Sequence, residues 1–290
     1  MTKALIKSMR LRTLPLSLAG VVCGGLLGAQ SGEWKVENVF TFALVLLTAV
    51  FLQILSNLSN EMGDYRSGVD GADRQGPAYG MANGLTEKQL WRAINTTVVL
   101  CAVSGLLMLL LSFQFSIFNF QFSSLLVLGA AAIWAATHYT LGKKPYGYIG
   151  LGDLFVFIFF GLVSVLGSYF VIAHTISFEA WLICPACGIG LLSVAVLNVN
   201  NIRDMASDEG IRRTIPLRIG RRAAQWYQTF LVVGGTVLMC APHFQWWYGF
   251  PVGGIAVHLW MVWSREGKQL DPALPILVIS TFFLALMYGL

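Results

Sequence analysis

The sequence predicts an all-α membrane protein that crosses the bilayer many times. Of its 290 residues, 56% are hydrophobic and only 11% are charged, and the mean hydropathy is +0.69. A soluble domain has about a quarter of its residues charged, so this chain has more apolar surface than an aqueous protein buries. A transmembrane helix needs roughly 20 mostly apolar residues, and such stretches recur from one end of the chain to the other.

Nine apolar segments are long enough to be transmembrane helices, and we expect them to form one domain over residues 1–290. The first is short and rich in glycine, and the last three lie close together. The third helix has a defined start, because Thr86 and Gln89 have the spacing of a capping box. In chain order, the segments are 14–29, 38–58, 93–113, 122–140, 152–173, 180–200, 223–241, 244–263 and 273–290.

Lysine and arginine residues predict the orientation of these helices. If the N-terminus is cytoplasmic and the loops alternate, eighteen of the nineteen basic residues lie on the cytoplasmic side, and only Lys35 lies outside. An excess of basic residues in cytoplasmic loops is the usual pattern of membrane proteins. We therefore expect a multi-pass protein of the inner (cytoplasmic) membrane with its C-terminus outside. The same pattern accounts for the net charge of +5 and gives no reason to expect a nucleic acid as a partner.

Two short polar motifs follow apolar segments on the expected cytoplasmic side. The first is NLSNEMGD, residues 57–64, and the second is NVNNIRD, residues 198–204, with Asp208 four positions later. They end the second and the sixth helices, and both repeat Asn, Asn and Asp at spacings of three or four. Their likeness suggests two duplicated halves, about 10–140 and 150–290, with a site between them. We expect that site on the cytoplasmic side of the membrane.

The polar residues of each motif share one helix face because they are three or four positions apart. If the two faces meet, their carboxylates repel one another in a medium of low dielectric constant unless a cation lies between them. Ligands that are all oxygen atoms favour a hard metal, above all Mg²⁺, which combines a few carboxylates with waters and substrate phosphates. The candidate metal ligands are Asn57, Glu61, Asp64, Asn201, Asp204 and Asp208.

Basic residues near both motifs can bind phosphate oxygens directly. Acids that hold Mg²⁺ and bases that hold phosphate, at the mouth of an apolar bundle, describe a receptor for a diphosphate with a long apolar tail. Two other interpretations are open, namely acids that are only solvated or paired with nearby arginines, and an ion-coupled transporter. A transporter places such acids near the midplane, whereas these lie at helix ends. The basic residues are Arg66, Lys143, Lys144, Arg203, Arg212 and Arg213.

Further stretches carry a resemblance to a known family. The two motifs fit N-x-x-N-[D/E]-x-x-D-x-x-x-G-x-D and N-N-x-R-D-x-x-x-D, and four blocks accompany them: RLRTLP at 10–15, DRQGP at 73–77, PYGYIGLGDLFVFIFFG at 145–161 and RTIPLRIG at 213–220. In this order and spacing they resemble the UbiA superfamily of intramembrane prenyltransferases. Within it, they are most similar to the menaquinone branch, the 1,4-dihydroxy-2-naphthoate polyprenyltransferases. The resemblance extends from residue 10 to about residue 222.

The resemblance implies nine helices around a central cavity and a Mg²⁺-dependent reaction. A polyprenyl group would pass from polyprenyl diphosphate to 1,4-dihydroxy-2-naphthoate, with loss of the carboxylate, to give demethylmenaquinol. Tyr139 matches a family tyrosine near the reactive end of the prenyl group. The positions that match metal and diphosphate ligands are Asn57, Asp64, Asp204 and Asp208, and those that match basic residues facing the diphosphate are Arg12, Lys143 and Arg203.

Three places depart from the family pattern. Glu61 stands where an aspartate is usual, which keeps the charge but lengthens the side chain. Tyr79 lies close after Gly-Pro, in a stretch where the family commonly has an arginine, and Glu209 and Arg212 replace a basic residue and a glycine. A related prenyltransferase whose acceptor is hydroxybenzoate, homogentisate or haem is the nearest alternative within the superfamily.

The expected chemistry assigns catalytic roles to Asp64, Asp204, Tyr139 and Asp153. Neutralising the diphosphate as it leaves allows the C1–O bond to ionise toward an allylic cation. Aromatic faces such as those of Tyr139 or Phe155 would stabilise that cation. Asp153, at the start of the fifth helix, either orients or deprotonates the acceptor's hydroxyl group or only compensates the helix dipole.

Overall fold

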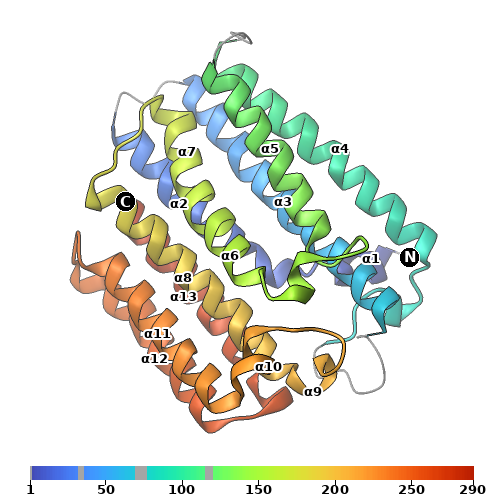
Figure 1. Cartoon of the computed structure of the whole chain (residues 1–290). Helices are drawn as coiled ribbons and strands as arrows, with labels where there is room; N and C mark the ends of the chain where they lie inside the picture. The colour runs from blue at the N-terminus through green and yellow to red at the C-terminus, as the bar shows by residue number, and fades with distance from the viewer. Residues whose placement is uncertain (1, 32–35, 69–76, 115–119) are drawn as a thin grey trace.

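The computed structural model describes residues 2–31, 36–68, 77–114 and 120–290, and every regular element in these ranges is a helix (Figure 1). The all-α expectation is thus confirmed for the described residues. In the first half lie α1 (Thr2–Ser8), η1 (Leu11–Thr13), α2 (Leu14–Gln30), α3 (Val36–Ser67), η2 (Met81–Asn83), α4 (Glu87–Ser112) and α5 (Phe120–His138). There follow η3 (Tyr146–Ile149), α6 (Gly152–Val156), η4 (Phe157–Val163), α7 (Ser164–Ala173), α8 (Ala180–Arg203), α9 (Met205–Asp208), α10 (Ile215–Ile219), α11 (Arg221–Cys240), η5 (Trp246–Tyr248), α12 (Gly249–Ser264), η6 (Gly267–Leu270) and α13 (Ala273–Gly289).

Seven helical segments among the described residues are long and apolar enough to cross a membrane. The chain is therefore a multi-pass membrane protein. Two further expected segments, 223–241 and 244–263, coincide with α11 and α12, which do not reach that limit. Helix α12 has only 16 residues, and α11 starts with two arginines and buries Gln225 and Gln228. Nine crossings and the orientation of the termini stay predictions.

Local sequence explains where the main helices begin. The predicted capping box is confirmed, because the Thr86 side chain accepts a hydrogen bond from the Gln89 N–H while the Gln89 side chain accepts one from the Thr86 N–H. Helix α2 has a proline in its first turn, where the missing N–H breaks no hydrogen bond.

Between α6 and α7, η4 is a π-helix, and π-helical turns are frequent at functional sites.

Glycines allow the central helices to pack closely. A Cβ atom on Gly24 of α2 would lie 2.0 Å from the carbonyl oxygen of Val165 in α7, and one on Gly161 of η4 would press against the backbone of α8. Helix α8 is joined to α11 by a buried hydrogen bond of 2.8 Å from Asn198 Nδ2 to Gln228 Oε1. These contacts connect α2, α7, α8 and α11 into one continuous core.

The two polar motifs lie at the same end of the bundle. Asp64 is in the last turn of α3, and Asp204 directly follows α8. Figure 1 shows the short helices α1, α9 and α10 gathered at this end. The segments between transmembrane helices therefore form the surroundings of both motifs.

Candidate active site

A cavity of about 420 Å³ lies between α2, α3, α5, the helix from α6 to α7, α8 and α13. Away from the polar motifs its lining is apolar and includes Val21, Val45 and Val171. At the end that carries the motifs, the lining becomes polar and charged and includes Arg10 and Arg212. The cavity thus suits a ligand with an ionic head and a long apolar body.

Arg212 connects the two polar motifs. Its Nη2 atom donates a hydrogen bond to Asp64 Oδ1, and its Nε atom lies 3.6 Å from Asp208 Oδ1. The Tyr148 hydroxyl donates to the same Asp64 oxygen at 3.3 Å, and the guanidinium carbon lies 4.9 Å from the centre of the Tyr148 ring. Because Asp64 belongs to the first motif and Asp208 to the second, one cation lies between carboxylates from both halves of the chain.

Asp208 and Arg212 are charged groups that the protein buries. Asp208 is 1% exposed, and neither of its carboxylate oxygens has a hydrogen-bond partner among the described residues. Burial raises the pKa of Asp208 to about 6, although the charge of Arg212 opposes the shift. Burial would lower the pKa of Arg212, but Asp64 and Asp208 outweigh it and raise that pKa, so the guanidinium stays charged. An acid so poorly compensated favours a further cation at this point.

Arg203 orients the acid of the second motif. Its Nε and Nη2 atoms donate to the two carboxylate oxygens of Asp204 at 2.8 and 2.6 Å, and Nη1 donates to Asp271 Oδ1 at 2.8 Å. Nη2 also donates to Asn200 Oδ1 at 2.8 Å. Asp204 and Asn201 line the cavity. The structure therefore directs the donors of Arg203 to protein acceptors, and Arg203 connects Asp204 to Asp271 in the segment just before α13.

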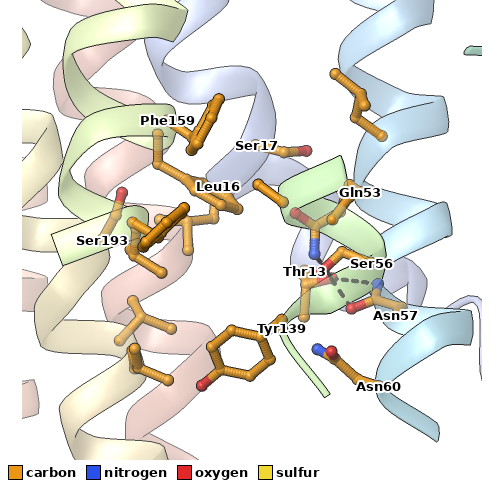
Figure 2. A pocket seen from close by; sticks show the side chains of 18 of the residues that line it. Thr13, Leu16, Ser17, Gln53, Ser56, Asn57, Asn60, Tyr139, Phe159 and Ser193 are labelled. Atoms are coloured by element: carbon orange, nitrogen blue, oxygen red, sulfur yellow. Dashed lines mark hydrogen bonds between the residues drawn. The ribbon is translucent and has the colours of Figure 1, made fainter. Parts of the chain in front are cut away.

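Asn57 holds the short segment that carries two arginines. Its Nδ2 atom donates to the Met9 carbonyl oxygen at 2.9 Å and to Thr13 Oγ1 at 3.0 Å, while its Oδ1 atom accepts from Gln53 Nε2 at 3.2 Å. Figure 2 shows Thr13, Gln53 and Asn57 joined by these bonds at the edge of the cavity. The amide predicted to be a metal ligand thus fixes the segment between α1 and α2.

This segment presents a candidate anion site. The Arg10 guanidinium lies 3.9 Å from the centre of the Tyr79 ring, and Arg12 Nη2 donates to the Tyr79 hydroxyl at 3.1 Å. Arg10 Nε and Nη2 are buried, and among the described residues they have no hydrogen-bond partner. Arg10 also has a left-handed backbone, with φ of 48°, and such conformations concentrate at functional sites. All three side chains line the cavity, so an anion in it would satisfy the open donors.

Tyr139, Tyr146 and Phe155 form an aromatic wall of the cavity. The Tyr139 ring meets Tyr146 edge-on at 5.4 Å, and Tyr146 stacks on Phe155 at 4.1 Å between ring centres. A Cβ atom on Gly147 would lie 2.7–2.9 Å from Tyr139 atoms, and one on Gly152 would lie 3.1–3.2 Å from them, so both glycines leave room for this ring. Burial raises the pKa of the Tyr139 phenol, which therefore stays neutral. Tyr139, Tyr146 and Phe155 all line the cavity, and the wall can stabilise a cation inside it.

Several predicted site residues are not brought to the cavity. Glu61 is buried, and its Oε1 atom accepts the Met81 N–H at 2.6 Å instead. Asp153 Oδ2 accepts the Tyr227 hydroxyl at 3.0 Å. The predicted residues that do not line the cavity are Glu61, Arg66, Lys143, Lys144, Asp153 and Arg213.

For two of these residues, Arg66 and Arg213, the structure shows where they lie instead. Arg66 pairs with Glu87 at the start of α4 and lies over the Trp91 ring. Arg213 is exposed and donates its backbone N–H to Tyr148 at 3.0 Å. Asp70, Asp73 and Arg74, together with most of the DRQGP block and Lys35, lie outside the described residues.

Sequence reasoning missed Arg10, Tyr79 and Tyr148 as site residues. Arg10 was within the RLRTLP block, and its charge next to an apolar helix was the available signal. No sequence signal pairs Tyr79 with Arg10 or Tyr148 with Asp64, because each contact joins segments that are distant in the chain.

The donor set fits a hard divalent ion. Among the described residues, no three His, Cys, Asp or Glu side chains form a cluster able to hold a metal ion by themselves. Mg²⁺ needs no such cluster, since it takes one or two carboxylates and completes its shell with waters and substrate phosphates. The unpartnered oxygens of Asp208 beside Asp64 are ligands of this kind. Asp204 and Asn201 line the same part of the cavity.

A charged mouth on an apolar cavity, within a bundle of membrane helices, fits a membrane-embedded protein whose ligand is an amphipathic anion. The model of the UbiA prenyltransferase family matches residues 17–287. The chain therefore belongs to the UbiA prenyltransferase family, and it is a prenyltransferase enzyme.

Curated relatives agree with this assignment, and a solved structure agrees with the fold. The 1,4-dihydroxy-2-naphthoate octaprenyltransferase of Escherichia coli (strain K12) is 42% identical over 82% of this chain and 75% of that protein. The enzyme of the same name from Haemophilus influenzae (strain ATCC 51907 / DSM 11121 / KW20 / Rd) is 38% identical over 78% of this chain and 72% of that protein. The apo structure of a UbiA homologue from Aeropyrum pernix K1 matches with a TM-score of 0.67 and 13% identity, over 96% of this chain and 98% of that chain. That structure supports the fold alone.

Replacing Asn57 should loosen the arginine-bearing segment. Asn57→Ala removes two donated hydrogen bonds, each worth about 1 kcal/mol, so the Thr13 amide, which donates to the Arg10 carbonyl, should exchange its hydrogen several-fold faster. Hydrogen exchange read by mass spectrometry on protein in detergent measures this. The matched control is Asn60→Ala, because Asn60 contacts Thr140 instead. Equal exchange in the wild type and Asn57→Ala would contradict the assignment.

Proposed function

We propose that this chain transfers a polyprenyl group from polyprenyl diphosphate to 1,4-dihydroxy-2-naphthoate, with loss of the carboxylate, in menaquinone biosynthesis. The names of relatives that are 37–42% identical support both the reaction and the acceptor. The observation that carries the proposal is the position of Arg212 between Asp64 and Asp208. It means that two acidic motifs, about 140 residues apart, meet at the mouth of one apolar cavity.

The donor substrate fits the two parts of the cavity. Its diphosphate would lie at the charged end, where Arg10 offers two unpartnered donors and Arg12 lies beside it. Its polyprenyl tail would follow the apolar lining formed by α2, α3, α5 and α7. Phe155, Phe159 and Val163 are four residues apart on the α6–α7 helix, share one helix face and all line the cavity.

Mg²⁺ is the divalent ion that we propose for this site. Asp64, Asp204 and Asp208 would hold it through carboxylate oxygens, with Asn201 at the same part of the cavity. When bound, the ion supplies Lewis-acid neutralisation of the leaving diphosphate. Arg203 keeps Asp204 in place through two hydrogen bonds, and Arg10 binds diphosphate oxygens that the ion leaves free.

The remaining residues protect and stabilise the developing carbocation. Water is excluded by the apolar lining, so a reactive cation at C1 of the prenyl group is not hydrolysed. The ring of Tyr139, packed against Tyr146, offers a π face that stabilises positive charge by about 1–2 kcal/mol. Its neutral phenol can also donate a hydrogen bond to the acceptor. Asp153 contacts Tyr227 outside the cavity lining, so we assign it no step with the acceptor.

The same charge pattern supports a topology for the whole chain. We propose nine crossings of the inner membrane, with the N-terminus and the active site on the cytoplasmic side and the C-terminus outside, because this arrangement leaves only Lys35 among the basic residues outside. The single domain would consist of two duplicated halves that each contribute one acidic motif.

The direct test is turnover by purified protein in detergent. With a polyprenyl diphosphate, 1,4-dihydroxy-2-naphthoate and Mg²⁺, the enzyme should release diphosphate and form a prenylated naphthoquinol. Asp64→Asn and Asp204→Asn should each lower kcat by roughly 100-fold or more, the usual loss when a group that stabilises transition-state charge is removed. Glu209→Gln is the matched control, because Glu209 is an exposed acid next to Asp208.

Three results would contradict parts of this proposal. Near-normal rates in both Asp variants would reject the metal assignment. Faster turnover with hydroxybenzoate or homogentisate would reject the acceptor. Ion uptake without diphosphate release would favour a transporter.

Arg10 provides an independent test of the diphosphate position. Arg10→Gln should raise the KM for polyprenyl diphosphate by roughly tenfold or more, because a hydrogen bond to a charged group contributes about 1.5–3 kcal/mol, while the KM for the acceptor changes little. Lys7→Gln removes the same charge from an exposed side chain that contacts Asn83 outside the cavity, and should leave both KM values unchanged. An unaltered KM for the donor in Arg10→Gln would place the diphosphate elsewhere.

A further inference from the structure

Arg212 occupies the space that a metal ion needs. Its guanidinium contacts Asp64 and lies 3.6 Å from Asp208, and both acids are candidate metal ligands. Two cations within about 4 Å of each other repel strongly in a medium of low dielectric constant. The present contacts of Arg212 and a metal ion bound to both acids therefore exclude each other.

The backbone around Arg212 is fixed, so only its side chain has to move. The Arg212 N–H donates to the Asp208 carbonyl at 3.0 Å, and the next amide, that of Arg213, donates to the Tyr148 carbonyl at 3.0 Å. The guanidinium itself lies against the Tyr148 ring rather than being locked by a third acid. A rotation about the side-chain bonds can carry it away from Asp64 while it stays next to the cavity.

The negative charges of Asp64 and Asp208 are not equally compensated by their neighbours. Both oxygens of Asp208 lack hydrogen-bond partners among the described residues, and the Nε atom of Arg212 that faces them lacks one as well. Asp64, in contrast, accepts hydrogen bonds from both Arg212 and Tyr148. Arg212 thus compensates the two acids unequally, as a replaceable cation would.

We propose that Arg212 is an exchangeable internal cation, which lies between Asp64 and Asp208 and turns to the diphosphate when the metal–diphosphate pair enters. The inference rests on the proposed function, because it needs a metal-bound diphosphate as the incoming ligand. Arg212 competes with a free metal ion for the two acids. In the loaded protein, the guanidinium binds phosphate oxygens in the bidentate manner typical of arginine.

This exchange makes the binding of metal and diphosphate cooperative. A metal ion that binds alone must displace Arg212, and the displaced guanidinium then has no new anionic partner. When diphosphate is present, the displaced guanidinium finds phosphate oxygens, so its displacement is compensated. The enzyme would therefore bind a free divalent ion weakly and the metal together with diphosphate tightly.

The test compares two affinities in Arg212→Gln. The probes are Mn²⁺ alone, followed by its electron paramagnetic resonance signal, and Mn²⁺ with inorganic pyrophosphate. Mn²⁺ alone should bind at least about fivefold more tightly to Arg212→Gln than to the wild type, the low end of typical coupling between ligands, whereas the Mn²⁺–pyrophosphate pair should bind more weakly. The matched control is Arg222→Gln, because Arg222 is exposed and stacks on Trp263 away from the cavity.

The proposal is supported if Arg212→Gln binds Mn²⁺ alone more tightly than the wild type does and binds Mn²⁺ with pyrophosphate more weakly. Weaker binding of both probes would indicate a merely structural arginine, and unchanged affinity for Mn²⁺ alone would overturn the exchange while leaving the proposed function intact. If the wild type binds no Mn²⁺ even with pyrophosphate, the metal part of the proposed function fails and the inference fails with it.

A second variant guards against misfolding. Should the melting temperature in detergent show that Arg212→Gln does not fold, Arg212→Lys replaces it. Lysine keeps the charge but lacks the planar fork that reaches two acids, so intermediate affinities are expected for both probes. Wild-type affinities in Arg212→Lys would overturn the proposal.

Discussion

The structure depends on the compensation of buried negative charge at the meeting point of its two halves. Asp64 at the end of α3 and Asp208 in α9 both lie beside the guanidinium of Arg212, and Asp208 is almost completely buried. Buried acids of this kind are costly unless a cation compensates their charge or they take up a proton. The contacts of Arg212 and Tyr148 join α9, η3 and the end of α3 at the charged mouth of an otherwise apolar cavity.

Most of the helical architecture could be predicted from hydropathy, because a membrane helix must satisfy all of its backbone hydrogen bonds internally and remain apolar outside. The start of α4 was predicted from the pair Thr86 and Gln89. The segments at α11 and α12 were harder to judge. Helix α11 buries Gln225 and Gln228, which form hydrogen bonds with Val262 and Asn198. Buried polar residues with hydrogen-bond partners lower the mean hydropathy of a helix although it stays inside the bundle.

The candidate site was predicted in part. The spacing within each motif predicted residues that share a helix face, but it left open whether the two motifs meet; in the structure Asp64, Asp204 and Asp208 all line one cavity. Periodicity does not reveal which backbone groups a side chain meets. Glu61 shares that face but its carboxylate accepts the Met81 N–H, and Asn57 is used to hold the segment before α2. Contacts of this kind join distant segments and arise only in the folded chain.

A double-mutant cycle between Asp64 and Arg212 tests most directly whether the two halves meet. Asp64→Asn, Arg212→Gln and the double variant would be compared by the free energy of unfolding of the protein in detergent. Residues in contact within one ion-pair network typically couple by about 0.5–3 kcal/mol, and for this buried pair we expect at least about 1 kcal/mol. Strictly additive effects would show that the two side chains do not interact, and the common site of the two motifs would have to be abandoned.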